Sequence, residues 1–159
     1  MINVFVDDRL SSRGDFHGDI HLEIAALGLY IIADTYFFAI DHGFMPDIEN
    51  GRKVIISIRN LLKSWKDGME KLSIKEHIFL PFDFSDQYLG CLYVQKIDDS
   101  CRICYGYTTE DTGVSILPSK GVVAIENGKF LIKTNTVEID TVTLLNDIDK
   151  SIENLPNIL

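Results

Sequence analysis

The chain has 159 residues, of which 24 are acidic and 15 basic, so its net charge is −9 with histidine neutral. Apolar residues make up 46% of it, which excludes a disordered chain, and the length suits one domain over residues 1–159. The acidic balance argues against a nucleic-acid-binding module and against docking on an anionic membrane.

The opening third of the chain has strand patterns. Residues 2–6 are short, apolar and β-branched, and they predict a first strand. Polar and apolar side chains alternate through residues 15–24, which is typical of a half-buried strand. Residues 24–34 fit either a helix or a strand reached through a bend at Gly28. The aromatic run over residues 35–40 predicts a further strand.

A long amphipathic helix follows. Apolar side chains recur at helical spacing from Val54 to Leu72, whereas the opposite face carries mostly lysine and arginine. Residues 52–75 hold seven basic and two acidic residues, a charge of +5. The remaining eight basic and 22 acidic residues give −14. The acid excess therefore lies outside this helix, on predicted strands and loops.

The second half returns to strand patterns. Residues 77–80 lead into a predicted hairpin of 88–97 with 101–108, and Asn127-Gly128 predicts a second hairpin of 122–125 with 130–132. From Asp140 a helical stripe of Leu144, Ile148, Ile152 and Leu155 runs to Pro156. We therefore expect an α+β fold: a mostly antiparallel β-sheet packed against a central amphipathic helix, with a C-terminal helix.

Three features indicate a cytoplasmic protein. The N-terminus is acidic rather than cationic, and the longest apolar stretch, residues 24–33, is half the length of a membrane span. The chain has three cysteines, a small and odd number that does not suggest a disulfide scaffold. Cys101 and Cys104 form a C-x-x-C, but residues three apart on a strand point to opposite faces. We read them as core cysteines.

The polar face of residues 15–24 is a candidate site. It consists of Asp15, His17, Asp19, His21 and Glu23. Imidazoles and carboxylates on one face can hold a divalent metal or act as general acid and base. The same residues also fit the wet face of an antiparallel strand, or a surface that binds a partner.

A second candidate lies between two predicted strands. Asp83, Asp86 and Tyr88 cluster after Leu80-Pro81. Carboxylates accept paired hydrogen bonds from arginine, and tyrosine offers rigid contact area, so the cluster suits protein recognition. Local turn chemistry, with Asp and Ser capping backbone groups, is the alternative.

The runs LPFDFSDQYLGCLYV (80–94) and INVFVDDRLSSRGDFHGDIHLEI (2–24) resemble small bacterial immunity proteins of contact-dependent growth inhibition and related polymorphic-toxin systems. The resemblance covers about the first 95 residues in the order and spacing of their elements. It implies a cytoplasmic protein without cofactor or metal that binds a cognate toxin domain, often a nuclease, and blocks it without catalysis.

Our leading hypothesis is therefore a toxin-binding immunity protein, not an enzyme. Its acidic surface would meet a basic partner, through Asp83, Asp86 and Tyr88 first, and through Asp15, Asp19 and Glu23 second. Two alternatives stay open. One is a metal-dependent enzyme using Asp15, His17, Asp19 and His21. The other is a structural or adaptor subunit that binds an acidic partner through the basic helix face, residues 59–71.

Overall fold

A computed structural model describes residues 1–6, 19–41, 43 and 50–157. Its first sheet has three antiparallel strands in the order β1 (Ile2–Val6), β2 (Asp19–Ile24) and β3 (Leu29–Asp34). The predicted first strand is confirmed. The alternation is also confirmed over the described part of β2, where the apolar side chains Ile20, Leu22 and Ile24 are buried.

The undecided segment after Ile24 is mainly a strand. A short 3-10 helix, η1 (Ala25–Leu27), ends at Gly28 with φ of 59°, a left-handed conformation that suits glycine. β3 then turns back antiparallel to β2, with Ile24 opposite Leu29. Gly28 is therefore the predicted bend.

The strand predicted over residues 35–40 is wrong, because this segment forms helix α2 (Tyr36–Ile40). Phe37, Phe38 and Ala39 are three consecutive buried residues, which a strand facing water on one side cannot provide. The Phe38 ring meets the Phe84 ring edge to face at 5.4 Å. Packing against other elements has outweighed the β preference of aromatic residues.

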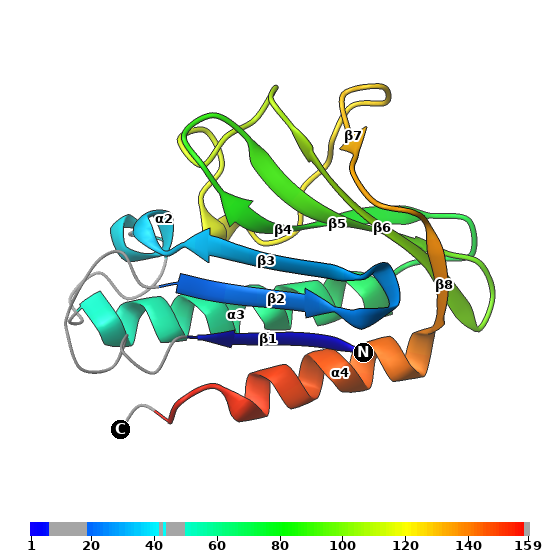
Figure 1. The fold of residues 1–159 in the computed structure, drawn as a ribbon, viewed down its shortest axis with the longest axis horizontal. Coiled ribbons are helices and arrows are strands. Elements are labelled where there is room, and N and C mark those ends of the chain that lie inside the picture. Colours follow the sequence, from blue (N-terminus) through cyan, green and yellow to red (C-terminus); the bar gives the residue numbers. More distant parts are fainter. Residues whose placement is uncertain (7–18, 42, 44–49, 158–159) are drawn as a thin grey trace.

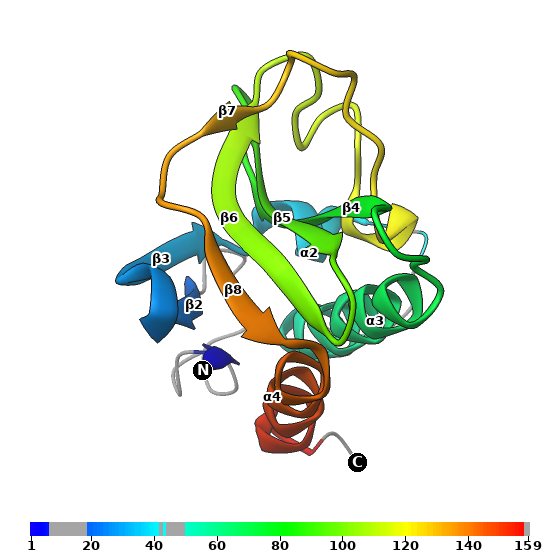
Figure 2. The same cartoon turned by 90° about the vertical axis from the view of Figure 1, so that its right-hand side faces the viewer.

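The central helix is α3 (Asn50–Glu70), as predicted. Its apolar stripe is buried: Val54, Ile58, Leu61, Leu62, Trp65 and Met69. Figure 2 shows α3 lying under the larger sheet. There the Trp65 indole N–H donates to the Pro81 carbonyl oxygen at 3.1 Å, so the largest core side chain also has its polar atom satisfied.

The second sheet has five strands. Its path runs β4 (His77–Phe84), β5 (Leu89–Lys96), β6 (Ser100–Thr108) and β7 (Leu131–Ile132), and β8 (Val137–Asp140) also pairs with β6. The predicted first hairpin is confirmed as β5 paired antiparallel with β6.

The hairpin predicted around Asn127-Gly128 is wrong in its pairing. Val123 bridges Phe79 of β4, and Ile132 of β7 pairs with Gly106 of β6, so the two flanking segments have different partners. A turn is still present: Gly128 has φ of 85°, and the Lys129 N–H donates to the Glu126 carbonyl oxygen. Another short 3-10 helix, η2 (Pro118–Lys120), precedes this region.

The last element is helix α4 (Thr141–Asn154), which begins as predicted after Asp140. It lies along β1, the outer strand of the first sheet (Figure 1). The backbone N–H of Ile2 donates to Asp147 Oδ2 at 2.9 Å, and that of Val4 donates to Ser151 Oγ at 3.0 Å. The helix thus covers the edge of the sheet.

These elements form an α+β fold of antiparallel sheets, a central helix and a C-terminal helix, as the sequence predicts. The predicted single sheet is in fact two sheets, and one core cluster takes side chains from both of them and from α2, α3 and α4. Among the described residues, no helix is long and apolar enough to cross a membrane.

Candidate partner-binding site

The predicted cluster of Asp83, Asp86 and Tyr88 lies at the tight connection between β4 and β5. The pairing register shifts between Pro81 and Asp83, so Asp83 stands opposite Gly90. The Ser85 N–H then donates to the Tyr88 carbonyl oxygen at 3.1 Å, which closes the turn. Local turn chemistry is therefore present, as the alternative interpretation expected. It fixes the positions of the acidic and aromatic side chains.

Asp83 and Tyr88 form a hydrogen-bonded pair. The Tyr88 hydroxyl donates to Asp83 Oδ2 at 2.8 Å. Burial raises the pKa of Asp83 above its ordinary value; the bond from Tyr88 acts in the opposite direction, and the nearby Asp34 carboxylate adds to the rise. Burial, followed by the bond to Asp83, raises the pKa of Tyr88 to about 12. Tyr88 is therefore a neutral hydrogen-bond donor at physiological pH.

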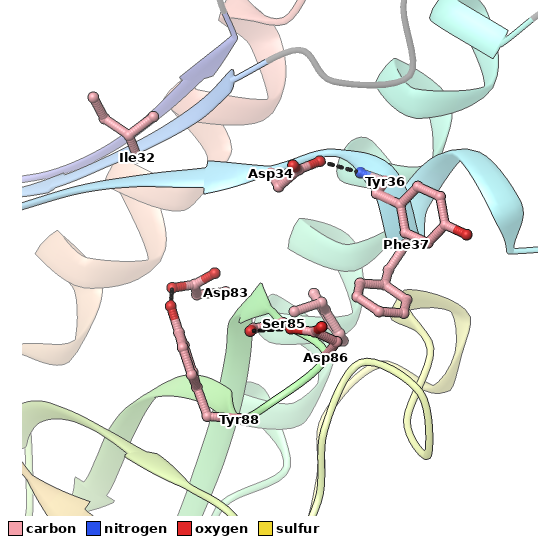
Figure 3. A pocket seen from close by; sticks show the side chains of 9 residues that line it. Ile32, Asp34, Tyr36, Phe37, Asp83, Ser85, Asp86 and Tyr88 are labelled. Atoms are coloured by element: carbon pink, nitrogen blue, oxygen red, sulfur yellow. Dashed lines mark hydrogen bonds between the residues drawn. The ribbon is translucent and has the colours of Figure 1, made fainter.

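A cavity of about 560 Å³ opens beside this pair, between the turn and the end of the first sheet. Figure 3 shows Asp34 of β3 above the cavity and Asp83, Ser85 and Asp86 below it, with Phe37 of α2 at one side. Three carboxylates thus share one hollow with apolar and aromatic walls. Such a site favours a cationic group.

The carboxylates are held in place by nearby donors. Asp34 Oδ1 accepts from the Tyr36 N–H at 2.7 Å, and Asp86 Oδ1 accepts from the Ser85 hydroxyl at 3.4 Å. Sequence reasoning missed Asp34 and Tyr36, since it left residues 24–34 undecided and made residues 35–40 a strand. The available signal was an acid, Asp34, at the end of the apolar run 24–33, with an aromatic residue, Tyr36, two positions later.

The second predicted surface is described only in part. Asp15 and His17 lie outside the described residues, and of Asp19 the structure describes only the backbone, which pairs with Asp34. Glu23 is exposed and pairs with Tyr30. Because paired residues point to the same face, the face of β2 that bears Glu23 continues onto β3 and reaches the cavity at Asp34.

That face also exposes apolar side chains. Tyr30 and Ile32 of β3 are each 54% exposed. His21 stacks on Phe5 with ring centroids 4.6 Å apart, and its Nδ1 lies 2.6 Å from the Tyr30 hydroxyl. A mixture of acidic and large apolar groups is typical of a protein interface rather than of a purely solvated face.

Little in the described structure adds to the metal hypothesis. No group of three or more His, Cys, Asp or Glu side chains within the described ranges could hold a metal ion. His21 is engaged with Phe5 and Tyr30. Because Asp15, His17 and the Asp19 side chain are not described, the metal-dependent enzyme stays a prediction.

The basic face of α3 is partly covered. Lys66 Nζ lies 2.7 Å from Asp149 Oδ2 of α4, and the Arg59 guanidinium donates to the Pro156 carbonyl oxygen at 3.1 Å. This contact leaves less of the basic face for the acidic partner that the adaptor hypothesis requires. Cys101 and Cys104 are free and buried, which agrees with their interpretation as core residues.

Comparison of the sequence with family models and with curated proteins gave no match. Comparison of the fold with solved structures found a chain of the CdiA-CT/CdiI toxin and immunity complex from Enterobacter cloacae. The two chains superpose with a TM-score of 0.54 and are 14% identical; the match covers 97% of this chain and 99% of the other. The two proteins share a fold over nearly their whole lengths.

Proposed function

We propose that this protein is an immunity protein that binds a cognate toxin domain and neutralises it without catalysis. The observation that supports this most is the fold shared with a chain of a toxin and immunity complex over 97% of this chain and 99% of that one.

The surface supports the same proposal. The cavity lined by Asp34, Asp83 and Asp86 adjoins the exposed Tyr30 and Ile32 of β3, so carboxylates and apolar contact area lie together. We propose that this is the partner-binding site, with Tyr88 inside it and with Asp19 and Glu23 extending it along β2. Asp15, which lies outside the described residues, stays a predicted member of this surface. Tight binding needs such a desolvated centre within a polar rim.

We further propose that the toxin domain is a nuclease. A nuclease needs a cationic cleft for phosphates, and an acidic protein can fill that cleft or lie beside it. Opposite charges also speed the encounter, which matters when each toxin molecule must be captured before it acts. Inhibition would follow from a one-to-one complex.

The test is co-expression with the protein encoded directly upstream, followed by purification through a tag on either partner. We expect a one-to-one complex and growth of cells that the toxin alone would kill. Asp83→Asn with Asp86→Asn should weaken the complex, whereas Asp98→Asn, in the turn at the other end of β5, should not. No complex and no protection would contradict the proposal, as would growth inhibition by this chain alone.

A further inference from the structure

A second hollow is also lined by Asp83 and Tyr88. Its volume is about 490 Å³, and three of its walls are tyrosines, Tyr88, Tyr105 and Tyr107. The remaining lining residues are Ile31, Asp83, Gln87, Gly90 and Thr109. We name this hollow the tyrosine pocket. Among the described residues, its lining contains one carboxylate and no basic side chain.

The Tyr105 hydroxyl is the unusual group in this pocket. Tyr105 is 7% exposed, and its hydroxyl has no hydrogen-bond partner among the described residues. A buried polar atom without a partner is costly, and most such atoms in folded proteins have one. The hydroxyl lies beside Asp83, because a side-chain carbon added at Gly90 would collide with the Tyr105 hydroxyl and would lie 2.8 Å from Asp83 Cβ.

The Tyr105 hydroxyl and the Cβ of Asp83 therefore both lie beside Gly90. Asp83 Oδ2 is taken by Tyr88, which leaves Oδ1 and the Tyr105 hydroxyl oxygen available to a donor. Glycine at position 90 is what allows the hydroxyl to lie this close to the backbone of β5. A group that brings several N–H donors to this point would satisfy the hydroxyl and the carboxylate together.

The aromatic walls favour a cation. The faces of tyrosine rings attract positive charge, and Lys133 Nζ already lies 5.0 Å from the centroid of the Tyr107 ring. The Tyr88 and Tyr107 rings meet at an angle, with centroids 5.8 Å apart. A guanidinium fits better than an ammonium, because it is flat enough to stack on a ring while its five N–H groups reach separate acceptors.

We infer that the tyrosine pocket receives an arginine side chain of the toxin domain, with its guanidinium at Asp83 and the Tyr105 hydroxyl and its plane against the tyrosine rings. This inference rests on the proposed function and names the partner group that the site would recognise. Burial raises the pKa of Asp83, and a cation seated beside it would offset that cost.

A small probe tests the pocket without the toxin. Arginine blocked at both ends is titrated into the labelled protein, and the amide signals of Gly90, Tyr105 and Tyr107 are followed by NMR. We expect shifts that saturate at millimolar concentration. Blocked citrulline has the same shape but no charge, and it should bind at least about tenfold more weakly. Equal binding of the two probes would overturn the inference.

Two variants test the named acceptors. Tyr105→Phe removes the unpaired hydroxyl, so we expect the free protein to melt at a higher temperature and to bind blocked arginine about tenfold more weakly. Asp83→Asn should weaken probe binding at least as much. Tyr93→Phe makes the same change as Tyr105→Phe outside the pocket and should leave probe binding unaltered.

Binding of the toxin domain to the same variants provides the last test. Its affinity for the Tyr105→Phe and Asp83→Asn variants should fall about tenfold or more relative to the wild-type protein and to Tyr93→Phe. Unchanged toxin affinity in both variants would overturn the inference that the tyrosine pocket receives an arginine of the toxin domain. It would leave the proposed immunity function in place. Conversely, a failure to form any toxin complex would reject the proposed function, and probe binding would still decide whether the pocket recognises a guanidinium.

Discussion

Asp83 lies in surroundings that disfavour its own charge. Burial raises its pKa more than the hydrogen bond from Tyr88 lowers it. The folded protein therefore holds the Asp83 proton more tightly than the unfolded chain does. This gives a stabilising contribution that is full below the ordinary pKa and is lost as the pH rises through the raised pKa.

This sign leads to a first prediction, for Asp83→Asn. Asparagine stays neutral, so the stability of the variant relative to the wild-type protein should increase as the pH rises from about 4 towards neutral. Urea denaturation at several pH values measures the difference in the free energy of unfolding. Asp98→Asn controls for the loss of one exposed negative charge. A difference that stays flat with pH would contradict the direction given for Asp83.

Tyr88 provides a second prediction at this scale. Its pKa of about 12 results first from burial, then from the hydrogen bond to Asp83 and the charge of Asp83. Asp83→Asn removes the charge, so we expect the Tyr88 pKa to fall towards its ordinary value. Ultraviolet difference titration against Tyr88→Phe isolates the signal of this one tyrosine. If the titration of Tyr88 were the same in both backgrounds, burial alone would account for its pKa.

At the level of single residues, the sequence could group part of the proposed site. Asp83, Asp86 and Tyr88 could be grouped because they lie within six positions and share one turn. Tyr105 and Asp34 could not. Tyr105 reaches Gly90 across the β5 and β6 ladder, and Asp34 comes from the other sheet. Residues that meet only through strand pairing leave no trace in local spacing.

At the scale of elements, the spacing of two side chains along α4 matches the spacing of two backbone N–H groups along β1. Asp147 and Ser151 are four residues apart on a helix, a rise of about 6 Å, and Ile2 and Val4 are two apart on a strand, about 6.6 Å. Each side chain therefore meets one backbone N–H of the strand edge. The helix replaces the hydrogen bonds that another strand would have given.

The third prediction follows from this match. Asp147→Ala leaves the N–H of Ile2 without its acceptor and should lower the free energy of unfolding by about 1–3 kcal/mol. Asp149→Ala is the control, because it removes only the more exposed pair with Lys66 and should cost clearly less than Asp147→Ala. Chemical denaturation measures both. Equal effects of the two substitutions would mean that the edge contact is unimportant.

Asp140 permits a fourth prediction. Its Oδ2 accepts from the Thr143 N–H at 2.9 Å and caps the first turn of α4. Asp140→Ala should cost about 1 kcal/mol, whereas Asp140→Asn should cost much less, because asparagine caps nearly as well. Thermal or urea unfolding of the two variants tests this. A loss in Asp140→Asn as large as that in Asp140→Ala would indicate a role other than capping.

The elements that were predicted correctly are those whose pattern is local. Helices α3 and α4 show a full apolar stripe, and β5 and β6 are adjacent in the chain. The errors concern segments whose partners are distant. Helix α2 is set by its packing on Phe84, and Val123 bridges β4 rather than its neighbour. An Asn-Gly pair identifies a turn, but not which strands pair on either side of it.

For the whole molecule, the net charge of −9 does not show that some basic and acidic side chains pair within the chain. Part of the basic face of α3 meets acids of its own chain, as Lys66 does with Asp149. The carboxylates of Asp34, Asp83 and Asp86 gather instead around one cavity. Among the described residues, these three carboxylates thus give one surface a concentration of negative charge, whereas Lys66 of α3 is paired within the chain.

This distribution gives a fifth prediction, which depends on the proposed function. The rate of association with the toxin should fall steeply as ionic strength rises, since surface charges are screened beyond about 10 Å at 0.1 M salt. Stopped-flow mixing at increasing salt measures the rate. Asp86→Asn, at an exposed position of the turn, should slow association more than Asp98→Asn. A rate that does not depend on salt would contradict electrostatic steering.

The contact between β1 and α4 also bears on how the chain reaches its fold. Ile2 and Asp147 are 145 positions apart, and Val4 and Ser151 are 147 apart. During synthesis the first strand leaves the ribosome long before the helix that covers its edge. Until then the N–H groups of β1 are open to pairing with other chains. Closure of so long a loop is expected to be a late and slow step of folding.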